Sequence, residues 1–437
     1  MISKFIEVCN QNKTKPSIIH NNKIYSYQTL LDDIKKMMTL FKSKGLKEHD
    51  KVVLFIPLSY KFYMVLLASM MYKLNIVVID SFKDQEKLDQ MIKQSKPKMV
   101  LVTPLSKLFS KRFKNIELLN VKDYQSYTPS DVDLNYSLND IILTTFTSGT
   151  TRMPKMIERS YNDLSNQIKV ISQNVKFRND CINLCMLPIY VLFSLFSGIT
   201  VVIDKKVSQT LIDKYKIDTI QAPLKKLLTV KSSISNIKNI YIGGAILYRK
   251  EAKHLKTIFP AATFTYVYGA SEGVLIGQTT LNEYLKDIFS FSIIEGVNVS
   301  IDSPNEEGVG EIIIQGDFVL TKEHTHYTGD IGKVENNKIY VYGRKKYSCL
   351  EKNFYNYITD NKLLEENNCE NIFTFSYNNV IYVAYSGSIK DQLKDYCYLK
   401  FKKIPVDIKH QTKADYNKII KSKQLWYLSG LFFTWHI

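Results

Sequence analysis

The chain has few cysteines, and their spacing excludes the usual metal and disulfide frameworks. Its 437 residues contain six cysteines, with no CxxC pair and no histidine at metal-ligand spacing. Cys181 and Cys185 can share one helix face, but two thiols alone make a poor zinc site. We therefore expect six reduced thiols, as is usual for a cytosolic protein.

Long apolar runs are also missing. The segment 1–15 lacks the apolar core of a secretory signal peptide. The apolar segment 62–72 is far shorter than the roughly 20 residues that a membrane-spanning helix needs. The sequence therefore predicts a soluble, cytoplasmic protein without stable membrane insertion.

Acidic residues are outnumbered. The chain has 59 Lys and Arg against 42 Asp and Glu, a net charge of +17. Such an excess suits nucleic acid, an anionic membrane or a polyanionic small molecule. The lysines are nevertheless spread along the chain, and no basic block alternates with aromatic residues. We interpret the charge as a solvated basic surface and expect no nucleic-acid partner.

Strand-like and helical patterns alternate through the first three quarters of the chain, which is long enough for more than one domain. The first such series comprises a strand at 51–58, a helix at 60–72, a strand at 75–80, a helix at 84–95 and a strand at 98–103. Parallel strands need crossovers of this kind, usually helices. The sequence therefore predicts an α/β fold with parallel sheets.

Further elements extend this pattern and then change it. Strands are expected at 140–146, 200–204, 217–223 and 239–246, and Ser160 and Asp163 have the spacing of a capping box. Past Asp302 short strands and turns dominate, with a hairpin turn at 335–338. From about residue 345 the chain is rich in Lys and Asn, which predicts a small separate α+β domain.

The stretch TTFTSGTTRMPK (144–155) raises the question of function. Seven of its twelve residues are Thr, Ser or Gly, but it is not a Walker loop, which needs a second Gly before the Lys. Its hydroxyls and backbone N–H groups can hold an anion. Taken alone, it is either a phosphate cradle or a solvated loop.

Two later segments favour a nucleotide. YVYGASEG (266–273) places an aromatic ring, a turn glycine, a hydroxyl and a carboxylate close together, and the segment 327–346 places Asp330 and Arg344 on either side of the predicted hairpin. An aromatic ring suits a purine, one acid suits ribose hydroxyls, and another suits a metal on phosphates. Together these residues describe a nucleotide site.

The order and spacing of four motifs resemble the adenylate-forming superfamily of acyl-CoA synthetases, luciferases and peptide-synthetase adenylation domains. The motifs are TSGTTRMPK, GGAIL, YGASEG and TGDIGKVENNKIYVYGRKK. The resemblance covers nearly the whole chain. It implies a large domain, 1–343, and a small mobile domain, 344–437, with a hinge near Lys346. It also implies two steps: ATP and a carboxylic acid form an acyl-adenylate, and a thiol such as coenzyme A then takes the acyl group.

The resemblance assigns phosphate and metal contacts by position. The β- and γ-phosphates are assigned to Thr147, Ser148, Gly149, Thr150, Thr151 and Lys155. Ser271 is assigned to the α-phosphate, and Glu272 to Mg²⁺, a hard cation that prefers oxygen ligands. The implied cofactors are ATP, Mg²⁺ and coenzyme A.

The nucleoside and the catalytic lysine are assigned in the same way. Adenine is expected against the backbone of Gly243, Gly244 and Ala245 and the ring of Tyr268, and the ribose on Asp330 with Arg344 nearby. KADYNKII (413–420) matches the family's RTxxGK pattern loosely, with Asn417 where the family has Gly. That match makes Lys418 the candidate to bridge the carboxylate and the α-phosphate.

The chain also departs from the family pattern. Arg152 stands where the phosphate loop usually has Gly, a residue with a wider choice of backbone conformation. The segment 345–357 contains no Gly, although the family usually has one there in the loop that lines the thiol tunnel. The end of the chain, 425–437, matches no family pattern.

The segment 186–198 indicates which kind of carboxylic acid is activated. Amino-acid-activating relatives carry an Asp there for the substrate ammonium, and this chain has no acidic residue. Val191 replaces a His that is common in acyl- and aryl-CoA ligases, which leaves room for a longer chain. We therefore expect a medium- or long-chain fatty acid, or another apolar acid, although the same run also suits ordinary helix core. The alternatives are transfer to an acyl carrier protein and a degenerate nucleotide-binding protein without turnover.

Overall fold

The computed structural model describes residues 1–79, 84–129, 131, 135–147, 155–269, 275–321, 323–390, 392–393, 395–405 and 418–422. The chain forms two compact units, which are described separately. Of the described residues, the first unit contains 1–221 and most of 317–324, and the second contains 222–269, 275–316 and those from 325 onward. Both units are mixed α/β, as the alternation of strands and helices predicted.

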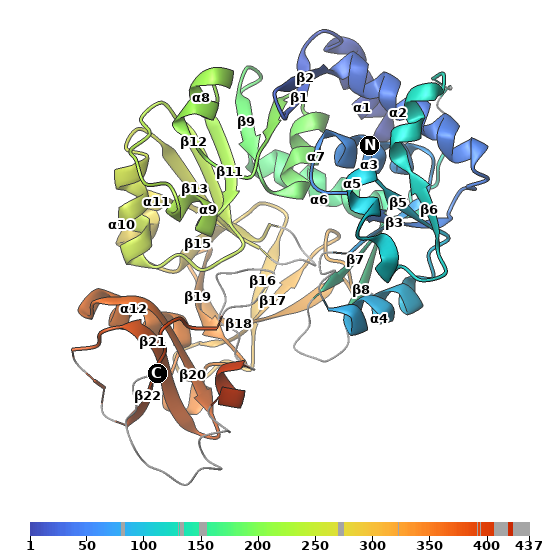
Figure 1. The fold of residues 1–437 in the computed structure, drawn as a ribbon. Coiled ribbons are helices and arrows are strands. Elements are labelled where there is room, and N and C mark those ends of the chain that lie inside the picture. Colours follow the sequence, from blue (N-terminus) through green and yellow to red (C-terminus); the bar gives the residue numbers. More distant parts are fainter. Residues whose placement is uncertain are drawn as a thin grey trace. The chain divides into compact units, whose positions relative to one another are not determined.

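The first unit contains a six-stranded sheet in the order β6-β5-β3-β4-β7-β8 (Figure 1). Its strands are β3 (Lys51–Phe55), β4 (Asn75–Val78), β5 (Met99–Val102), β6 (Glu117–Asn120), β7 (Ile141–Thr147) and β8 (Lys155–Ser160). All neighbours are parallel except β7 and β8. The accompanying helices are α3 (Tyr60–Met71), α4 (Gln85–Ser95), α5 (Pro104–Lys107) and the 3-10 turns η1 (Ser110–Arg112) and η2 (Val121–Ser126).

Five further strands, which belong to a 13-stranded sheet, pair in the first unit in the order β2-β1-β10-β9-β11. The strands are β1 (Pro16–His20), β2 (Lys23–Ser26), β9 (Ile182–Cys185), β10 (Thr200–Ile203) and β11 (Thr219–Pro223), and the helices are α1 (Ile2–Gln11), α2 (Tyr27–Ser43), α6 (Tyr161–Asn174), α7 (Pro188–Phe196) and α8 (Gln209–Tyr215). The buried Tyr27 hydroxyl donates to Ile199 O at 2.9 Å and so fixes α2 beside β10. The predicted capping box of α6 is confirmed, with Ser160 and Asp163 as its members.

The second unit is built around a mostly antiparallel sheet in the order β16-β17-β18-β19-β15-β14-β13-β12. Only β12 and β13 are parallel neighbours. The strands are β12 (Asn239–Gly243), β13 (Thr263–Tyr268), β14 (Gly277–Thr280), β15 (Ser290–Ile293), β16 (Asn298–Asp302), β17 (Gly310–Gln315), β18 (Thr325–Glu335) and β19 (Lys338–Arg344), and the helices are α9 (Leu224–Leu228), α10 (Arg249–Ile258) and α11 (Leu281–Lys286).

The predicted hairpin turn between β18 and β19 is confirmed. Asn336 and Asn337 both have positive φ, 51° and 59°, as a two-residue type I′ turn requires. Two other hairpins use the same dipeptide, Asn21-Asn22 between β1 and β2 and Asn378-Asn379 between two C-terminal strands.

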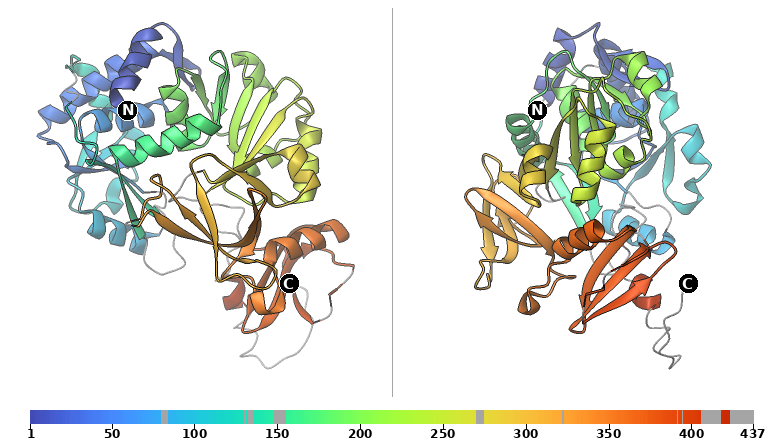
Figure 2. Two further views of the ribbon diagram at one scale, coloured as in Figure 1. Left: turned by 180° about the vertical axis from the view of Figure 1, so that it is seen from behind. Right: turned by 90° about the vertical axis from the view of Figure 1, so that its left-hand side faces the viewer.

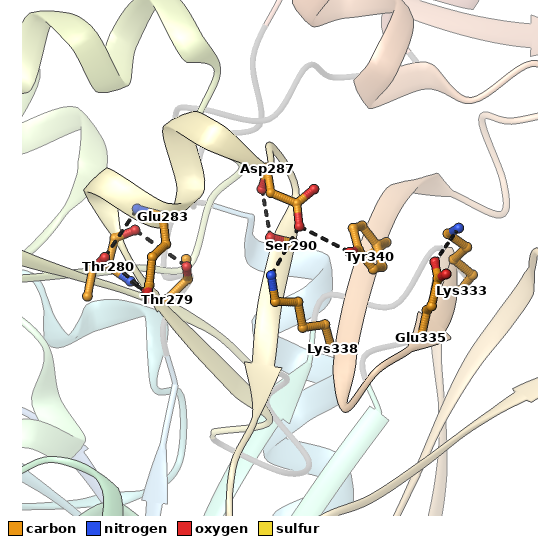
Figure 3. A network of polar contacts seen from close by, with 9 residues as sticks. All are labelled: Thr279, Thr280, Glu283, Asp287, Ser290, Lys333, Glu335, Lys338 and Tyr340. Carbon is orange, nitrogen blue, oxygen red and sulfur yellow. Dashed lines mark hydrogen bonds and ion pairs between the residues drawn. The ribbon is translucent and has the colours of Figure 1, made fainter.

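Polar contacts join α11 to the strands beside it (Figure 3). The Asp287 carboxylate accepts from the Tyr340 hydroxyl at 3.0 Å and from Lys338 Nζ at 3.2 Å, while its carbonyl oxygen accepts from the Ser290 hydroxyl at 2.6 Å. Thr280 and Glu283 form the capping box that begins α11. These contacts attach strand β19 of the β18–β19 hairpin to the end of α11.

The C-terminal part of the second unit has its own three-stranded sheet, β20-β21-β22, with α12 packed on β20 (Figure 2). Its elements are the turn η3 (Leu350–Lys352), α12 (Asn356–Glu366), β20 (Cys369–Tyr377), β21 (Val380–Gly387) and β22 (Tyr396–Lys400). A small core forms around Phe375 and includes Ile419 and Ile420. The predicted boundary between a large domain, 1–343, and a mobile small domain, 344–437, describes a movement during catalysis. It therefore stays a prediction.

Two absences were also predicted. All six cysteines are free thiols. No helix in the described parts of the chain is both long and apolar enough to cross a membrane.

Helix α12 is attached to the start of α10 by buried polar contacts. Asp360 is fully buried and accepts from the Tyr248 hydroxyl at 2.8 Å and from Thr374 N at 2.7 Å, and Asn361 accepts from Arg249 N at 2.9 Å. Burial raises the pKa of Asp360 to about 7, against the lowering effect of these donors. Burial likewise raises the pKa of Glu251, at the start of α10, to about 7.

We expect stability that depends on the protonation of Asp360. The pKa of Asp360 in the folded state lies above that in the unfolded state, so the folded protein binds the proton more tightly. The stability that this proton contributes is lost as pH rises from about 4 to about 7. The Asp360→Asn variant stays neutral. Its amide oxygen can accept from Thr374 N, and its NH2 group can donate to the Tyr248 hydroxyl, which then acts as the acceptor. The free energy of unfolding of the variant minus that of wild type, measured with urea and circular dichroism, should therefore grow as the pH is raised from about 5 to about 8.

Glu251 titrates in both proteins, so its effect cancels in that difference. A difference in unfolding free energy that stays constant across this range contradicts the raised pKa.

Candidate functional site

The residues predicted to contact adenine lie at the carboxyl ends of two parallel strands of the second unit. Gly243 ends β12, and Tyr268 ends its neighbour β13. The Tyr266 hydroxyl donates to Ala245 O at 2.8 Å, which holds the segment after β12 against β13. Crevices outside the carboxyl ends of parallel strands are common ligand sites in α/β proteins.

The two glycines at this position have different roles. A Cβ atom at Gly243 would lie 2.6 Å from Val267 Cγ2, so this glycine permits close packing of the two strands. Gly244 is exposed with φ +80°, and no atom lies within 4 Å of the position that its Cβ would take. Its backbone is therefore open to a flat ligand.

Asp330 and Arg344 form the second part of the site. They face each other across the β18–β19 ladder, with Arg344 Nε 3.1 Å from Asp330 Oδ1. Arg344 Nη1 also donates to Thr328 O at 3.0 Å. The neighbouring Asp330 carboxylate is the largest cause that raises the pKa of Arg344, so the guanidinium stays charged. Asp330 is only 8% exposed, which makes this pair an internal one.

Tyr268 joins the two parts. Its hydroxyl donates to Asp330 Oδ2 at 2.9 Å, and its ring packs on Phe291 at 5.5 Å between centroids. Four ladder steps separate β13 from β18, about 19 Å in a flat sheet at about 4.8 Å per step. The hydrogen bond therefore requires a strongly bent sheet. Burial is the main cause that raises the pKa of Tyr268 well above its usual value, so the hydroxyl stays protonated as a donor.

The carboxylate of Asp330 is oriented but not saturated. Among the described residues, each oxygen has one protein donor, Tyr268 or Arg344, and a carboxylate oxygen can accept more than one hydrogen bond. Two ribose hydroxyls are donors of the kind that this arrangement can accept. The structure thus brings together six predicted residues, namely Gly243, Gly244, Ala245, Tyr268, Asp330 and Arg344.

Sequence reasoning missed the residues that support this pair. Thr328 Oγ accepts from Asp330 N at 3.1 Å, and Glu311 accepts from Gly329 N at 3.1 Å and pairs with Lys345 at 2.6 Å. Thr328 stands beside the aspartate within the TGD motif, which is a signal that could have been used. Glu311 lies on β17 and has no local pattern that marks it.

The predicted phosphate and metal contacts lie largely outside the described residues. These are Ser148, Gly149, Thr150, Thr151, Ser271 and Glu272, together with the atypical Arg152. Thr147 ends β7 and Lys155 begins β8, and their backbones pair with each other. Both ends of the segment 148–154 therefore lie side by side. Within the described residues, no three His, Cys, Asp or Glu side chains gather as metal ligands.

Lys418 begins a helical segment, 418–422, at the small C-terminal sheet. The lysine is exposed, while Ile419 and Ile420 are buried in the core around Phe375. The two isoleucines therefore anchor the segment. The catalytic role of Lys418 stays a proposal, and the terminal segment 425–437 lies outside the described residues.

The glycine-free segment after Arg344 folds without glycine. Cys349 and Phe354 exchange backbone hydrogen bonds of 2.9 Å in both directions, and Asn353 provides the left-handed residue with φ 47°. Asn is among the residues that tolerate this conformation best. This departure from the family pattern is thus compatible with an ordered turn.

The mixed α/β fold, with large sheets and a smaller C-terminal sheet, is that of adenylate-forming enzymes. The chain belongs to the AMP-binding enzyme family, whose model matches residues 5–322. It is 21% identical to 4-coumarate:CoA ligase 1 of Petunia hybrida, over 78% of this chain and 74% of the relative. It is 24% identical to a D-alanine–D-alanyl carrier protein ligase of Staphylococcus epidermidis, over 75% and 74% of the two chains.

A solved structure shares the fold over nearly the whole chain. The o-succinylbenzoate CoA synthetase of Bacillus subtilis, in complex with its acyl-adenylate intermediate, superposes with a TM-score of 0.82 at 14% identity. The match covers 95% of this chain and 97% of that one. The fold class predicted from the sequence is therefore confirmed.

We expect Gly244→Ala to weaken nucleotide binding without a clash inside the protein. The added Cβ meets no protein atom within 4 Å, so it can clash only with a ligand on this backbone. We expect the Kd for AMP, measured by calorimetry, to rise about tenfold or more. Gly296→Ala is the matched control, with φ +83° and the same open surroundings. Both variants carry similar left-handed strain, about 1 kcal/mol. Equal affinity for AMP in the two variants contradicts the assignment.

Proposed function

We propose that this chain is an ATP-dependent acid–thiol ligase of the acyl-CoA synthetase type. The observation that carries the proposal is the Tyr268–Asp330–Arg344 arrangement beside the open backbone of Gly244. It matches what a nucleoside needs, and the family supplies the reaction class. The named relatives are ligases that join acids to coenzyme A or to a carrier protein.

The nucleoside is held by this chain's own groups. Its ribose hydroxyls donate to the remaining lone pairs of Asp330, and the ion pair with Arg344 holds that carboxylate in its orientation. Its adenine lies against the backbone from Gly243 to Ala245, beside the ring of Tyr268. Because these groups are already fixed by Phe291 and Thr328, little reorganisation accompanies binding.

The phosphates and the metal are assigned to groups whose geometry stays a proposal. The β- and γ-phosphates are assigned to the segment from Thr147 to Thr151 and to Lys155, the α-phosphate to Ser271, and Mg²⁺ to Glu272. Mg²⁺ held there would supply positive charge against the phosphates, and attack of the acid's carboxylate oxygen on the α-phosphorus would release pyrophosphate. Mg²⁺ on phosphates commonly uses only one or two protein carboxylates, so a single Glu suffices.

The substrate is proposed to be an acid without an ammonium group. The segment 186–198 forms α7 and its flanks, and Val191 on this helix is 1% exposed. The buried polar partners here are the neutral side chains of Asn183 and Ser194, 3.1 Å apart. An ammonium at this position lacks a counter-charge among the described residues of the helix.

A medium- or long-chain fatty acid stays our first proposal, and an aromatic acid is the second. The second is favoured by the names of two relatives, which act on 4-coumarate and o-succinylbenzoate. Coenzyme A is the proposed acceptor, and the carrier-protein ligase among the relatives makes a phosphopantetheine carrier the alternative.

Exchange of labelled pyrophosphate into ATP, run with separate acids, tests the activity. We expect exchange with fatty acids over part of a chain-length series, and none with D-alanine. Later addition of coenzyme A should yield the acyl-CoA. Exchange with D-alanine alone contradicts the substrate proposal, and tight ATP binding without exchange for any acid makes the chain a binding protein, with Arg152→Gly as the first variant to examine.

Lys418→Ala should slow adenylation far more than transfer from a preformed acyl-adenylate. A charge that stabilises the transition state is commonly worth about a hundredfold or more in rate. Lys421→Ala is the matched control, because Lys421 is exposed on the same helical segment. The two half-reactions are measured separately by pyrophosphate exchange and by thioester formation. Equal slowing of both, or equal effects of the two variants, shows that the lysine has been misassigned.

A further inference from the structure

The six-stranded sheet of the first unit has a topological switch point that the proposed activity does not use. From β3 the chain continues to β4 on one side, whereas from β5 it continues to β6 on the other. The neighbouring strands β3 and β5 are parallel, so their carboxyl ends open onto one crevice. Such crevices are where open α/β sheets usually bind ligands.

A groove of about 410 Å³ lies at this point. Phe55, Ile56 and Pro57 line it at the end of β3, and Leu105 and Phe109 line it after β5. Arg112 is the cation of the lining. The groove is therefore mostly apolar, with one positive group in its lining.

The segment after β5 exposes large apolar side chains in a fixed arrangement. Leu105, Leu108 and Phe109 are 65%, 71% and 60% exposed. A capping box between Thr103 and Ser106 holds the turn that carries them. Exposed apolar groups that are clustered, and not scattered singly, mark interaction surfaces.

The same segment anchors itself through a buried aromatic ring. Phe113 is 5% exposed and packs edge-on against Phe55, with 5.0 Å between ring centroids. The Ser110 hydroxyl donates to Lys107 O at 2.7 Å. The exposed leucines and phenylalanine are thus held outward by the fold.

Basic residues alternate with these apolar ones. The segment 103–116 contains Lys107, Lys111, Arg112 and Lys114 and no acidic residue. The three lysines are exposed. Glu117 follows the segment directly and begins β6, and Gln85 Nε2 in the first turn of α4 donates to Arg112 O at 3.2 Å. Acidic residues of α4 lie near that turn. One of them, Asp84, lies 3.7 Å from Lys87 and is partly neutralised there.

We propose that the surface formed by residues 103–116, with the groove beside it, docks the protein on an anionic lipid bilayer. Leu105, Leu108 and Phe109 enter the interfacial region, and Lys107 between them and Lys111 and Lys114 after them contact lipid phosphates. Apolar side chains that alternate with Lys and Arg on one surface are the chemistry of peripheral membrane binding. Docking of this kind needs no membrane-spanning helix.

The partner is a bilayer and not a protein because of the pattern of the surface. Protein interfaces deplete lysine at their centre, whereas here Lys107 stands between the exposed apolar residues and Lys111 and Lys114 follow them directly. Base stacking, as in nucleic-acid binding, would need several exposed aromatic rings, and among the described residues of this segment Phe109 is the only exposed one.

Co-sedimentation of the whole chain with vesicles tests the proposal. Vesicles of phosphatidylglycerol and phosphatidylcholine are compared with phosphatidylcholine alone, without ATP or acid, so the result does not depend on the proposed activity. We expect binding to the anionic vesicles that weakens as salt is raised. The double variant Leu108→Ser with Phe109→Ser should lower the partition coefficient by about tenfold or more.

Two further variants complete the experiment. Leu138→Ser is the matched control, since Leu138 is 56% exposed in the same unit but lies outside the segment, and it should bind as wild type does. Lys107→Gln with Lys111→Gln should lower binding by about fivefold for each lysine. Equal binding to neutral vesicles, or an equal loss in the control, overturns the proposal. Loss of a dimer in the double variant, seen by light scattering, assigns the surface to protein association instead.

Discussion

The carboxylate of Asp330 is the group on which the candidate site depends. It accepts from Tyr268 at 2.9 Å and pairs with Arg344 at 3.1 Å, and so it joins the end of β13 to the β18–β19 hairpin. In the proposed function, the remaining lone pairs of the same carboxylate accept from the nucleoside. One group thus serves the fold and the proposed binding.

Local patterns allowed much of the fold to be predicted from the sequence. The Ser160–Asp163 capping box and the turn at 336–337 depend on neighbours in the chain, and both are confirmed. The alternation of strands and helices gave the α/β class, although it did not predict the antiparallel pairing of β8 with β7. Strand ends were also predicted too long, since β3 ends at Phe55 and not at residue 58. Pro57 lacks the N–H that a longer ladder requires.

The candidate site was predictable to the extent that motifs lie at strand ends. Short motifs identified four residues of the site: Gly243, Tyr268, Asp330 and Arg344. The structure shows that they are in contact or lie on neighbouring strands. The bond from Tyr248 to Asp360 spans 112 residues and has no periodic pattern. Pairings of this range follow from packing alone. The same holds for Glu311, which is buried beside Lys345 without any sequence signal.

The asparagine turns have a consequence for the nucleic acid that encodes this chain. Among the described residues, Asn occupies eight of sixteen non-glycine positions with positive φ, and the whole chain has only 17 Gly in 437 residues, against about 7% in average proteins. Asparagine codons begin with AA, whereas glycine codons begin with GG. A gene can therefore shift its base composition toward A and T and still keep its hairpins, because Asn-Asn adopts the same left-handed turn that glycine favours.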